Sequence, residues 1–485
     1  MADQPNVILV VMDTTRADDA LNPEIAPALN DIGDAGTKAT QAVSTAPWTL
    51  PSHASLLTGT VPSKHGAHAG HELLDDTLAT LPELFREAGY ETACVSNNTW
   101  LSAESGFGRG FDSFKQMWQL VQSDNALSEL VDVTEERRTT AVARKLTEGN
   151  PLTNTINVLY RLLVRDRTDD GARRTTEWIS RWLTDRDDDR PFFLLTNYLE
   201  PHLEYRPPKR LAEQYLPDSY TYEDAMEIPQ EPWEYLAGHV TLEEGELEAL
   251  RGLYRAELAY LDEQLANLKQ SLVDAGEWED TVLVVTADHG ENVGDHGLMD
   301  HQYCLYETLV HVPLVLHGGP FTDGDDLTEL VSLVDIAPTL LDVAGIDATS
   351  AREEFQGQSF HPDADVNPRA FVVSEYMAPQ PSMDALERHV GELPPYIYDL
   401  DRSLRAIRTD EYKLVRGSDG AVELYNLDVD PREVANVAKT RPDVVEQLSS
   451  TLDEWLESFE TTTHDGAVSL GEARKRQLEE LGYIQ

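Results

Sequence analysis

The sequence predicts an α/β fold with a large mixed, mostly parallel sheet that is flanked by helices. Short aliphatic runs alternate with longer segments in which leucines recur at helical spacing, and this alternation is typical of parallel sheets with helical crossovers. Three of the aliphatic runs end directly in polar residues that can do chemistry. The chain has 485 residues, more than one hydrophobic core usually holds, so we expect a large domain and a smaller one.

The predicted strands are runs of β-branched and aliphatic residues, as expected for strands that are buried on both faces. They are Asn6 to Met12, Phe192 to Thr196, Thr281 to Thr286, Val312 to Leu316 and Ala370 to Ser374. The first leads into Asp13, the second into Glu200-Pro201-His202 and the third into Asp288-His289. Ligands of such sheets bind beyond the carboxyl ends of the strands. We therefore expect these side chains to meet at one edge.

Two segments between the strands have the leucine spacing of helices. Leu78 to Ala88 is closed by Gly89, and Glu246 to Ala275 carries leucines along one face. Residues 115–190 are polar with a mostly helical pattern, which indicates an insertion in the larger domain at 1–365. The insertion is either a lid over the site or an inert surface excursion.

The pattern of the sequence changes after about residue 366. Arg405 to Val415 has the pattern of a short alternating strand, and Ala421 to Leu427 of a second one. A helix is predicted over roughly Pro442 to Phe459. These elements predict a small C-terminal α+β subdomain at 366–485, in which a helix covers an antiparallel hairpin.

Acidic residues dominate the composition. The 88 Asp and Glu residues outnumber the 38 Lys and Arg residues, the formal net charge is −50, and the acidic residues are spread along the chain. Such a surface keeps a protein dispersed at high salt, so our hypothesis is a halophilic protein of a salty cytoplasm rather than a generic acidic one. Binding to nucleic acid or to anionic membranes is disfavoured by this charge.

The cysteines and the N-terminus also favour a cytoplasmic location. Cys94 and Cys304 are the only cysteines, too few for a disulfide scaffold. The apolar stretch Val7 to Met12 is short and has no preceding basic region, so no signal peptide is predicted. The best candidate for a membrane span, Ile156 to Val164, is interrupted by polar residues. The oligomeric state is left open.

The segment from Ala46 to Gly59 carries a motif. It reads Ala-Pro-Trp-Thr-Leu-Pro-Ser-His-Ala-Ser-Leu-Leu-Thr-Gly and resembles the pattern C/S-x-P-S-R-x-x-x-x-T-G of the sulfatase family, in the alkaline phosphatase superfamily. In that family the first Cys or Ser becomes the catalytic formylglycine. Here Thr49 replaces the Cys or Ser and His53 replaces the Arg, which implies a plain hydroxyl nucleophile and no formylglycine.

The C-terminal region resembles the same family. The sulfatase pattern R-A-[VI]-R-x-x-x-Y-K is matched from Arg405 to Lys413, and the pattern E-L-Y-[DN]-L-x-x-D-P-x-E-x-x-N is matched from Glu423 to Asn436. The resemblance therefore spans nearly the whole chain.

The candidate ligands for one divalent metal ion are Asp13, Asp288, His289 and Thr49. Carboxylates and an imidazole that converge in a cleft suit such an ion. The family resemblance implies Ca²⁺, but its second aspartate is replaced by Thr14. This loss favours Mn²⁺ or Zn²⁺, which accept imidazole. Taken singly, Asp288-His289-Gly290 is also compatible with a loop turn, and Asp13 with a helix N-cap.

The resemblance also implies roles in catalysis. Thr49 is the expected nucleophile, although Pro51-Ser52-His53 is equally an ordinary helix start. His202 matches the element that protonates or orients the leaving oxygen, a role that suits imidazole. His301 stands where the family has a sulfate-binding Lys.

Two further residues are candidates for substrate binding. His53 could bind the reacting centre in place of the family's Arg. Asn98 could donate to an anionic oxygen or belong to a strand-ending turn.

The sequence therefore predicts a metal-dependent sulfatase-family hydrolase that cleaves a small anionic ester by in-line attack from Thr49. The family favours sulfate esters, whereas a threonine nucleophile favours phosphate esters or phosphonates. The alternatives are a phosphodiesterase, a phosphonate ester hydrolase or a phosphotransferase of the same superfamily, and a non-catalytic member that binds an anion.

Overall fold

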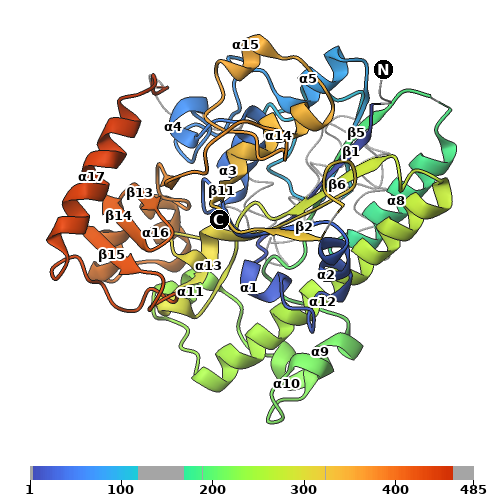
Figure 1. Cartoon of the computed structure of the whole chain (residues 1–485). Coiled ribbons are helices and arrows are strands. Elements are labelled where there is room, and N and C mark those ends of the chain that lie inside the picture. The colour runs from blue at the N-terminus through green and yellow to red at the C-terminus, as the bar shows by residue number, and fades with distance from the viewer. Residues whose placement is uncertain (1–3, 118–168, 188, 323, 463–485) are drawn as a thin grey trace, which may run out of the picture.

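The computed structural model describes residues 4–117, 169–187, 189–322 and 324–462. Within these residues a nine-stranded sheet forms the centre of the molecule, with strand order β10-β2-β9-β6-β1-β5-β3-β4 and β11 paired to β2 (Figure 1). The central strand β1 (Asn6–Met12) is parallel to β5 (Phe192–Tyr198) and β6 (Thr281–Thr286). These strands confirm the three aliphatic runs as neighbours at the centre of the sheet.

The remaining strands of this sheet are β2 (Thr37–Val43), β3 (Glu91–Ser96), β4 (Ser113–Gln116), β9 (His311–His317), β10 (Asp325–Leu327) and β11 (Val331–Ser332). Strand β9 is antiparallel to both β6 and β2, whereas the other pairings are parallel. The prediction of a mixed, mostly parallel sheet is confirmed.

Alternate residues of β1 explain why this strand is apolar throughout. Val7, Leu9 and Val11 pack into one hydrophobic cluster, and the intervening Ile8 and Val10 pack into a second cluster across the sheet. Since successive side chains of a strand point to opposite faces, both faces of the sheet must be covered.

Helices cover both faces. α2 (Pro27–Asp34), α8 (Ala172–Asp185) and α12 (Glu244–Ala275) contribute to the second cluster. α3 (Thr49–Thr58), α5 (Leu81–Glu87) and α14 (Ile336–Val343) contribute to the first, on the opposite side of the sheet (Figure 1). Shorter elements connect these layers: α1 (Ala17–Ala20), α4 (Pro62–His65), α9 (Lys209–Tyr215), α10 (Tyr222–Met226), α11 (Pro232–Leu236), α13 (Glu307–Val310), α15 (Thr349–Arg352), α16 (Met383–Val390), and the short strands β7 (Asn292–Val293) and β8 (Met299–Asp300).

The predicted helices are observed with shifted starts. α5 begins at Leu81 instead of Leu78, because the Glu83 carboxylate accepts a hydrogen bond from the Thr80 backbone N–H at 2.9 Å and so caps the helix there. α12 begins two residues earlier than predicted, at Glu244. The predicted insertion at 115–190 lies largely outside the described residues. No helix among the described residues is long and apolar enough to span a bilayer.

A separate antiparallel sheet follows in the C-terminal part. It consists of β12 (Val372–Tyr376), β13 (Leu404–Arg408), β14 (Tyr412–Gly417) and β15 (Val422–Asn426), and α17 (Pro442–Leu456) packs on it through Leu448 and Leu452. The prediction of one strand over Arg405 to Val415 is wrong. A turn at Thr409, whose N–H donates to the Tyr412 carbonyl at 2.8 Å, divides it into β13 and β14.

A buried ion cluster joins this sheet to the large one. Lys413 of β14 is fully buried, and its Nζ lies 3.0 Å from Glu307 Oε1 and 2.9 Å from Glu433 Oε1. Arg408 Nε lies 3.1 Å from the other Glu307 oxygen. Because Glu307 opens α13, which leads into β9, the cluster fixes the small sheet against the large one.

Replacing Lys413 with Ala is expected to leave the buried Glu433 carboxylate without its cation, while Glu307 keeps only Arg408. Removing one partner of a buried ion pair costs about 3–5 kcal/mol. The free energy of unfolding from urea titration should fall by that order. As a control, Lys209→Ala breaks an ion pair with Glu223 in which both side chains are at least half exposed. This variant should leave the free energy of unfolding nearly unchanged. Equal effects of the two variants would contradict the anchoring role.

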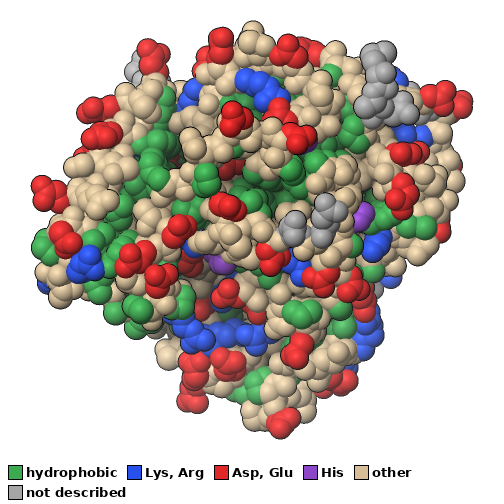
Figure 2. Space-filling model, in the orientation of Figure 1, with side chains coloured by type: hydrophobic (Ala, Val, Ile, Leu, Met, Phe, Trp, Pro, Cys, Tyr) green, Lys and Arg blue, Asp and Glu red, His purple; other side chains and the backbone are tan. Residues whose placement is uncertain are grey.

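The acidic surface leads to a second prediction. Figure 2 shows Asp and Glu side chains scattered over the whole visible face, with fewer Lys and Arg side chains among them. Repulsion among these charges is screened when the Debye length shrinks to about 3 Å in 1 M salt. The thermal unfolding temperature is therefore expected to rise steeply from dilute buffer to molar KCl. A protein that is most stable in dilute buffer would refute the halophilic hypothesis.

Candidate active site and metal centre

Four polar side chains follow neighbouring strands at the carboxyl edge of the sheet. Asp13 follows β1, Asp288 follows β6, and Asn98 follows β3. Asn197 is the penultimate residue of β5, the strand between β1 and β3. Since the strands are parallel, their ends place these side chains in one small region, which is the predicted convergence.

Asp13, Asp288 and His289 form a group with the geometry of a metal site. All three are fully buried, and one ligand atom from each lies within 4.8 Å of the others. His289 Nε2 is 3.4 Å from Asp288 Oδ2 and 3.8 Å from Asp13 Oδ1. His289 Nδ1 lies 2.9 Å from the Gly290 carbonyl oxygen, which assigns the proton to Nδ1 and leaves the lone pair of Nε2 facing the carboxylates.

The charges of this group support a cation. Burial and the neighbouring Asp288 carboxylate raise the pKa of Asp13 to about 7. Although burial opposes it, His289 and His53 hold the pKa of Asp288 down to about 2. Burial lowers the pKa of His289 to about 3, so its imidazole is neutral. Asp13 Oδ1 and Asp288 Oδ2 accept no hydrogen bond from the described part of the chain. These oxygens and the neutral nitrogen fit a divalent ion.

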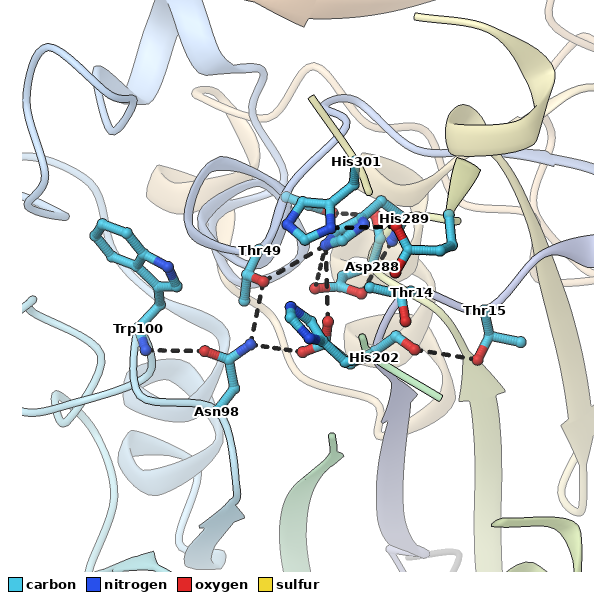
Figure 3. A network of polar contacts seen from close by, with 12 residues as sticks. Thr14, Thr15, Thr49, Asn98, Trp100, His202, Asp288, His289 and His301 are labelled. Atoms are coloured by element: carbon cyan, nitrogen blue, oxygen red, sulfur yellow. Dashed lines mark hydrogen bonds and ion pairs between the residues drawn. The ribbon is translucent and has the colours of Figure 1, made fainter. Parts of the chain in front are cut away.

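Thr49 lies beside this group. Its Oγ1 is 3.5 Å from His289 Nε2 and accepts a hydrogen bond from Asn98 Nδ2 at 3.1 Å (Figure 3). The same Asn98 nitrogen donates to Asp13 Oδ2 at 2.6 Å. Thr49 is also the first residue of the ten-residue helix α3, where the helix dipole favours negative charge. The hydroxyl is thus held next to the candidate ligands.

Thr14 has a backbone that threonine rarely adopts. Its φ of 51° lies in the left-handed region, and its hydroxyl is buried without a hydrogen-bond partner among the described residues. The Tyr254 hydroxyl donates to the Thr14 carbonyl at 3.0 Å, and the Arg16 N–H donates to the same Tyr254 oxygen at 2.9 Å. These contacts fix the chain as it leaves β1 and so orient Asp13.

His301 and His202 lie against the metal-ligand group. The His301 ring centroid is 4.6 Å from that of His289 and 5.2 Å from that of His202 (Figure 3). Although burial disfavours its charged form, contact with Asp300 raises the pKa of His301 well above its ordinary value. His202 donates from Nδ1 to the Leu203 carbonyl at 2.6 Å. The structure thus brings both predicted catalytic histidines to the site.

His53 contacts the main chain of Thr49 and the side chain of Asp288. Its Nδ1 lies 3.0 Å from the Thr49 carbonyl oxygen, one helical turn earlier, and 3.3 Å from Asp288 Oδ2. In this arrangement His53 orients the Asp288 carboxylate.

Three contributors were not predicted from the sequence. Asn197 donates to Asp13 Oδ2 at 3.3 Å and accepts from the Asn98 N–H at 3.2 Å. Ser52 donates to the Asp288 carbonyl at 2.6 Å. Glu291 lies 3.6 Å from His301 Nδ1. Asn197 carried a usable signal, since it is a polar residue at the end of an aliphatic run. The Ser52 contact joins elements far apart in the sequence, and the Glu291 contact depends on the pairing of β7 with β8.

The chain is similar to known arylsulfatases over most of its length. Arylsulfatase K of Homo sapiens is 24% identical over 481 residues, which cover 93% of this chain and 82% of that protein. Arylsulfatase K of Bos taurus is 25% identical over 484 residues, covering 93% of this chain and 81% of that protein.

Solved structures share the fold. The phosphonate monoester hydrolase of Agrobacterium radiobacter superposes with a TM-score of 0.67 at 20% identity, covering 96% of this chain and 99% of that chain. BT4656 in complex with D-glucosamine-2-N,6-O-disulfate superposes with a TM-score of 0.66 at 19% identity, covering 94% and 99%. The sequence model of the Sulfatase family matches residues 5–346. The chain therefore belongs to the sulfatase family, a hydrolase family of the alkaline phosphatase superfamily.

Proposed function

We propose that this hydrolase uses one divalent metal ion and the Thr49 hydroxyl to cleave a small sulfate or phosphate ester. The observation that carries the proposal is the position of Thr49 Oγ1, which lies 3.5 Å from His289 Nε2 in the Asp13–Asp288–His289 group. A hydroxyl placed there, at a helix N-terminus, is well suited to attack an anionic ester.

Asp13, Asp288 and His289 would hold the ion, with Thr49 as a fourth ligand. When bound, the ion supplies positive charge that lowers the hydroxyl pKa and offsets charge on the transferred group. Thr14 stands at the position of the family's second aspartate, so the ligand set has two carboxylates and one imidazole. This set favours Mn²⁺ or Zn²⁺ over the Ca²⁺ that is typical of the family.

The surrounding residues have distinct tasks in this proposal. Asn98 fixes the attacking oxygen relative to Asp13 through its two hydrogen bonds. Thr49 Oγ loses its proton to solvent and forms a bond to sulfur or phosphorus while the ester bond breaks, and His202 gives a proton to the leaving oxygen. His301 contacts the anionic oxygens of the substrate as an imidazolium. Water then hydrolyses the threonyl ester: it returns a proton to His202, its oxygen stays on the released sulfate or phosphate, and Thr49 regains its hydroxyl proton from solvent.

The nucleophile bears on the choice of ester. A formylglycine hydrate expels sulfate by collapsing to the aldehyde, and threonine cannot follow that route. Phosphate monoesters, phosphate diesters and phosphonates therefore suit this site better than sulfate esters. The name of the Agrobacterium radiobacter neighbour is that of a phosphonate monoester hydrolase, which is in keeping with this preference.

The location proposed for this activity is a cytoplasm rich in salt. The net charge of −50 and the free, buried thiols of Cys94 and Cys304 support it.

Thr49→Ala is expected to lower kcat at least about a thousandfold, because the group that forms the covalent bond is lost. Turnover of p-nitrophenyl phosphate, phosphodiester and sulfate in high KCl, with Mn²⁺, Zn²⁺, Mg²⁺ or Ca²⁺, measures the effect. Thr58→Ala, at the other end of α3, is the matched control and should keep the wild-type rate. Wild-type turnover by Thr49→Ala would disprove the nucleophile. A wild-type protein that binds metal but turns over none of these esters would support the anion-binding alternative.

Metal affinity is expected to depend on pH. The raised pKa of about 7 means that Asp13 is protonated below about pH 7 in the metal-free protein, so an incoming cation must displace a proton. Affinity for Mn²⁺ should therefore fall about tenfold for each pH unit below that pKa and level off above it. Calorimetric titration in buffers of different ionisation enthalpy measures both the affinity and the proton release. An affinity that is flat from about pH 6 to about pH 8 would contradict this charge assignment.

A further inference from the structure

A second group of metal-ligating side chains lies next to the first. It consists of Glu291, Asp300 and His301, and one ligand atom from each lies within 4.8 Å of the others. The short hairpin of β7 and β8 assembles it, because Asn292 pairs with Asp300 across the hairpin. This register brings Glu291, which precedes β7, beside residues that lie nine and ten positions later in the chain.

The buried Glu291 carboxylate has an ion-pair contact but no hydrogen bond among the described residues. The residue is fully buried, and neither oxygen of its carboxylate accepts a hydrogen bond within the described residues. The nearby Arg16 donates to the Glu291 main-chain carbonyl and ion-pairs with Asp295, so it does not bond the carboxylate. A buried carboxylate that lacks hydrogen bonds is costly, and Glu291 Oε1 instead faces His301 Nδ1 at 3.6 Å.

His301 directs the same nitrogen at both carboxylates. Its Nδ1 forms the ion pair with Asp300 Oδ1 as well as the longer contact with Glu291. Asp300 Oδ1 also accepts a hydrogen bond from the His301 backbone N–H at 2.7 Å, and Asp300 Oδ2 accepts one from Gln302 Nε2 at 2.6 Å. One oxygen of each carboxylate and the imidazole nitrogen thus lie close enough together to bind one ion.

We propose that Glu291, Asp300 and His301 form a second divalent cation site. The donor set matches that of the first group, and two carboxylates with a neutral imidazole balance the charge of a dication. A mixed nitrogen and oxygen set selects Mn²⁺ or Zn²⁺ rather than Ca²⁺. In binding, the cation takes the place of the proton on His301 Nδ1, and that proton is released to solvent.

The second cation would lie close to the first, because the rings of His289 and His301 are 4.6 Å apart at their centroids. It would supply, at the edge of the active site, the positive charge that otherwise resides on the His301 imidazolium. The proposal goes beyond the proposed function, which uses one ion.

Metal content of the full chain tests the proposal. The protein is freed of metal with a chelator, reloaded with Mn²⁺ or Zn²⁺ in high KCl, and its bound metal is measured by mass spectrometry. The wild type should bind two equivalents. Glu291→Gln and Asp300→Asn should each bind one, and Asp288→Asn should also bind one because it keeps the second site. Glu248→Gln, a control on the exposed face of α12, should still bind two.

Anomalous diffraction from wild-type crystals decides the case even if a variant fails to fold. Two peaks, one within the Glu291, Asp300 and His301 group, are expected. A single equivalent in the wild type with no peak at that group would overturn the proposal and leave a plain ion pair. The number of bound metal ions does not depend on whether Thr49 is the nucleophile. Activity measurements on Thr49→Ala test the proposed function alone.

Discussion

Two carboxylates, Asp13 and Asp288, are held next to each other in a region without exposure to water. Their mutual repulsion and the loss of hydration oppose this placement, so a compensating positive charge is required. Contacts with the His289 and His53 rings offset part of this cost, since they hold the pKa of Asp288 down. Asp13 Oδ1 and Asp288 Oδ2 accept no hydrogen bond within the described residues and remain available to a cation. The arrangement of the site follows from this electrostatic requirement.

The fold supplies the force that keeps the carboxylates together. β1 lies between β5 and β6 with every residue buried, and the packing of its two faces fixes where Asp13 leaves the sheet. α3 then presents Thr49 to the same point, while Ser52, one turn along, bonds the Asp288 carbonyl. Hydrophobic burial on both sides of the sheet therefore stabilises a polar centre that would be unfavourable by itself.

The departures from the family pattern form a consistent set. A threonine at position 49 keeps a side-chain hydroxyl but excludes the aldehyde, and a threonine at position 14 removes one carboxylate. His301 stands in place of a lysine, and its ion pairs with Asp300 and Glu291 keep positive charge there. Each change alters how charge is distributed around the Asp13–Asp288–His289 group.

The sequence by itself determined the central strands and the residues that follow them. A strand buried on both faces must be aliphatic throughout, so β1, β5 and β6 and the edge that carries Asp13 and Asp288 could be predicted from composition alone. The family motif located Thr49 in the same way. These features are local, because each depends on a short run of residues.

Only the tertiary structure decided which side chains meet. The antiparallel direction of β9, the turn of His53 toward Asp288 and the bridge from Asn197 to Asp13 depend on contacts between elements far apart in the sequence. The pairing of Glu291 with Asp300 and His301 depends on the register of the short hairpin formed by β7 and β8. Register and orientation arise from packing in three dimensions, and a pattern along the chain does not encode them.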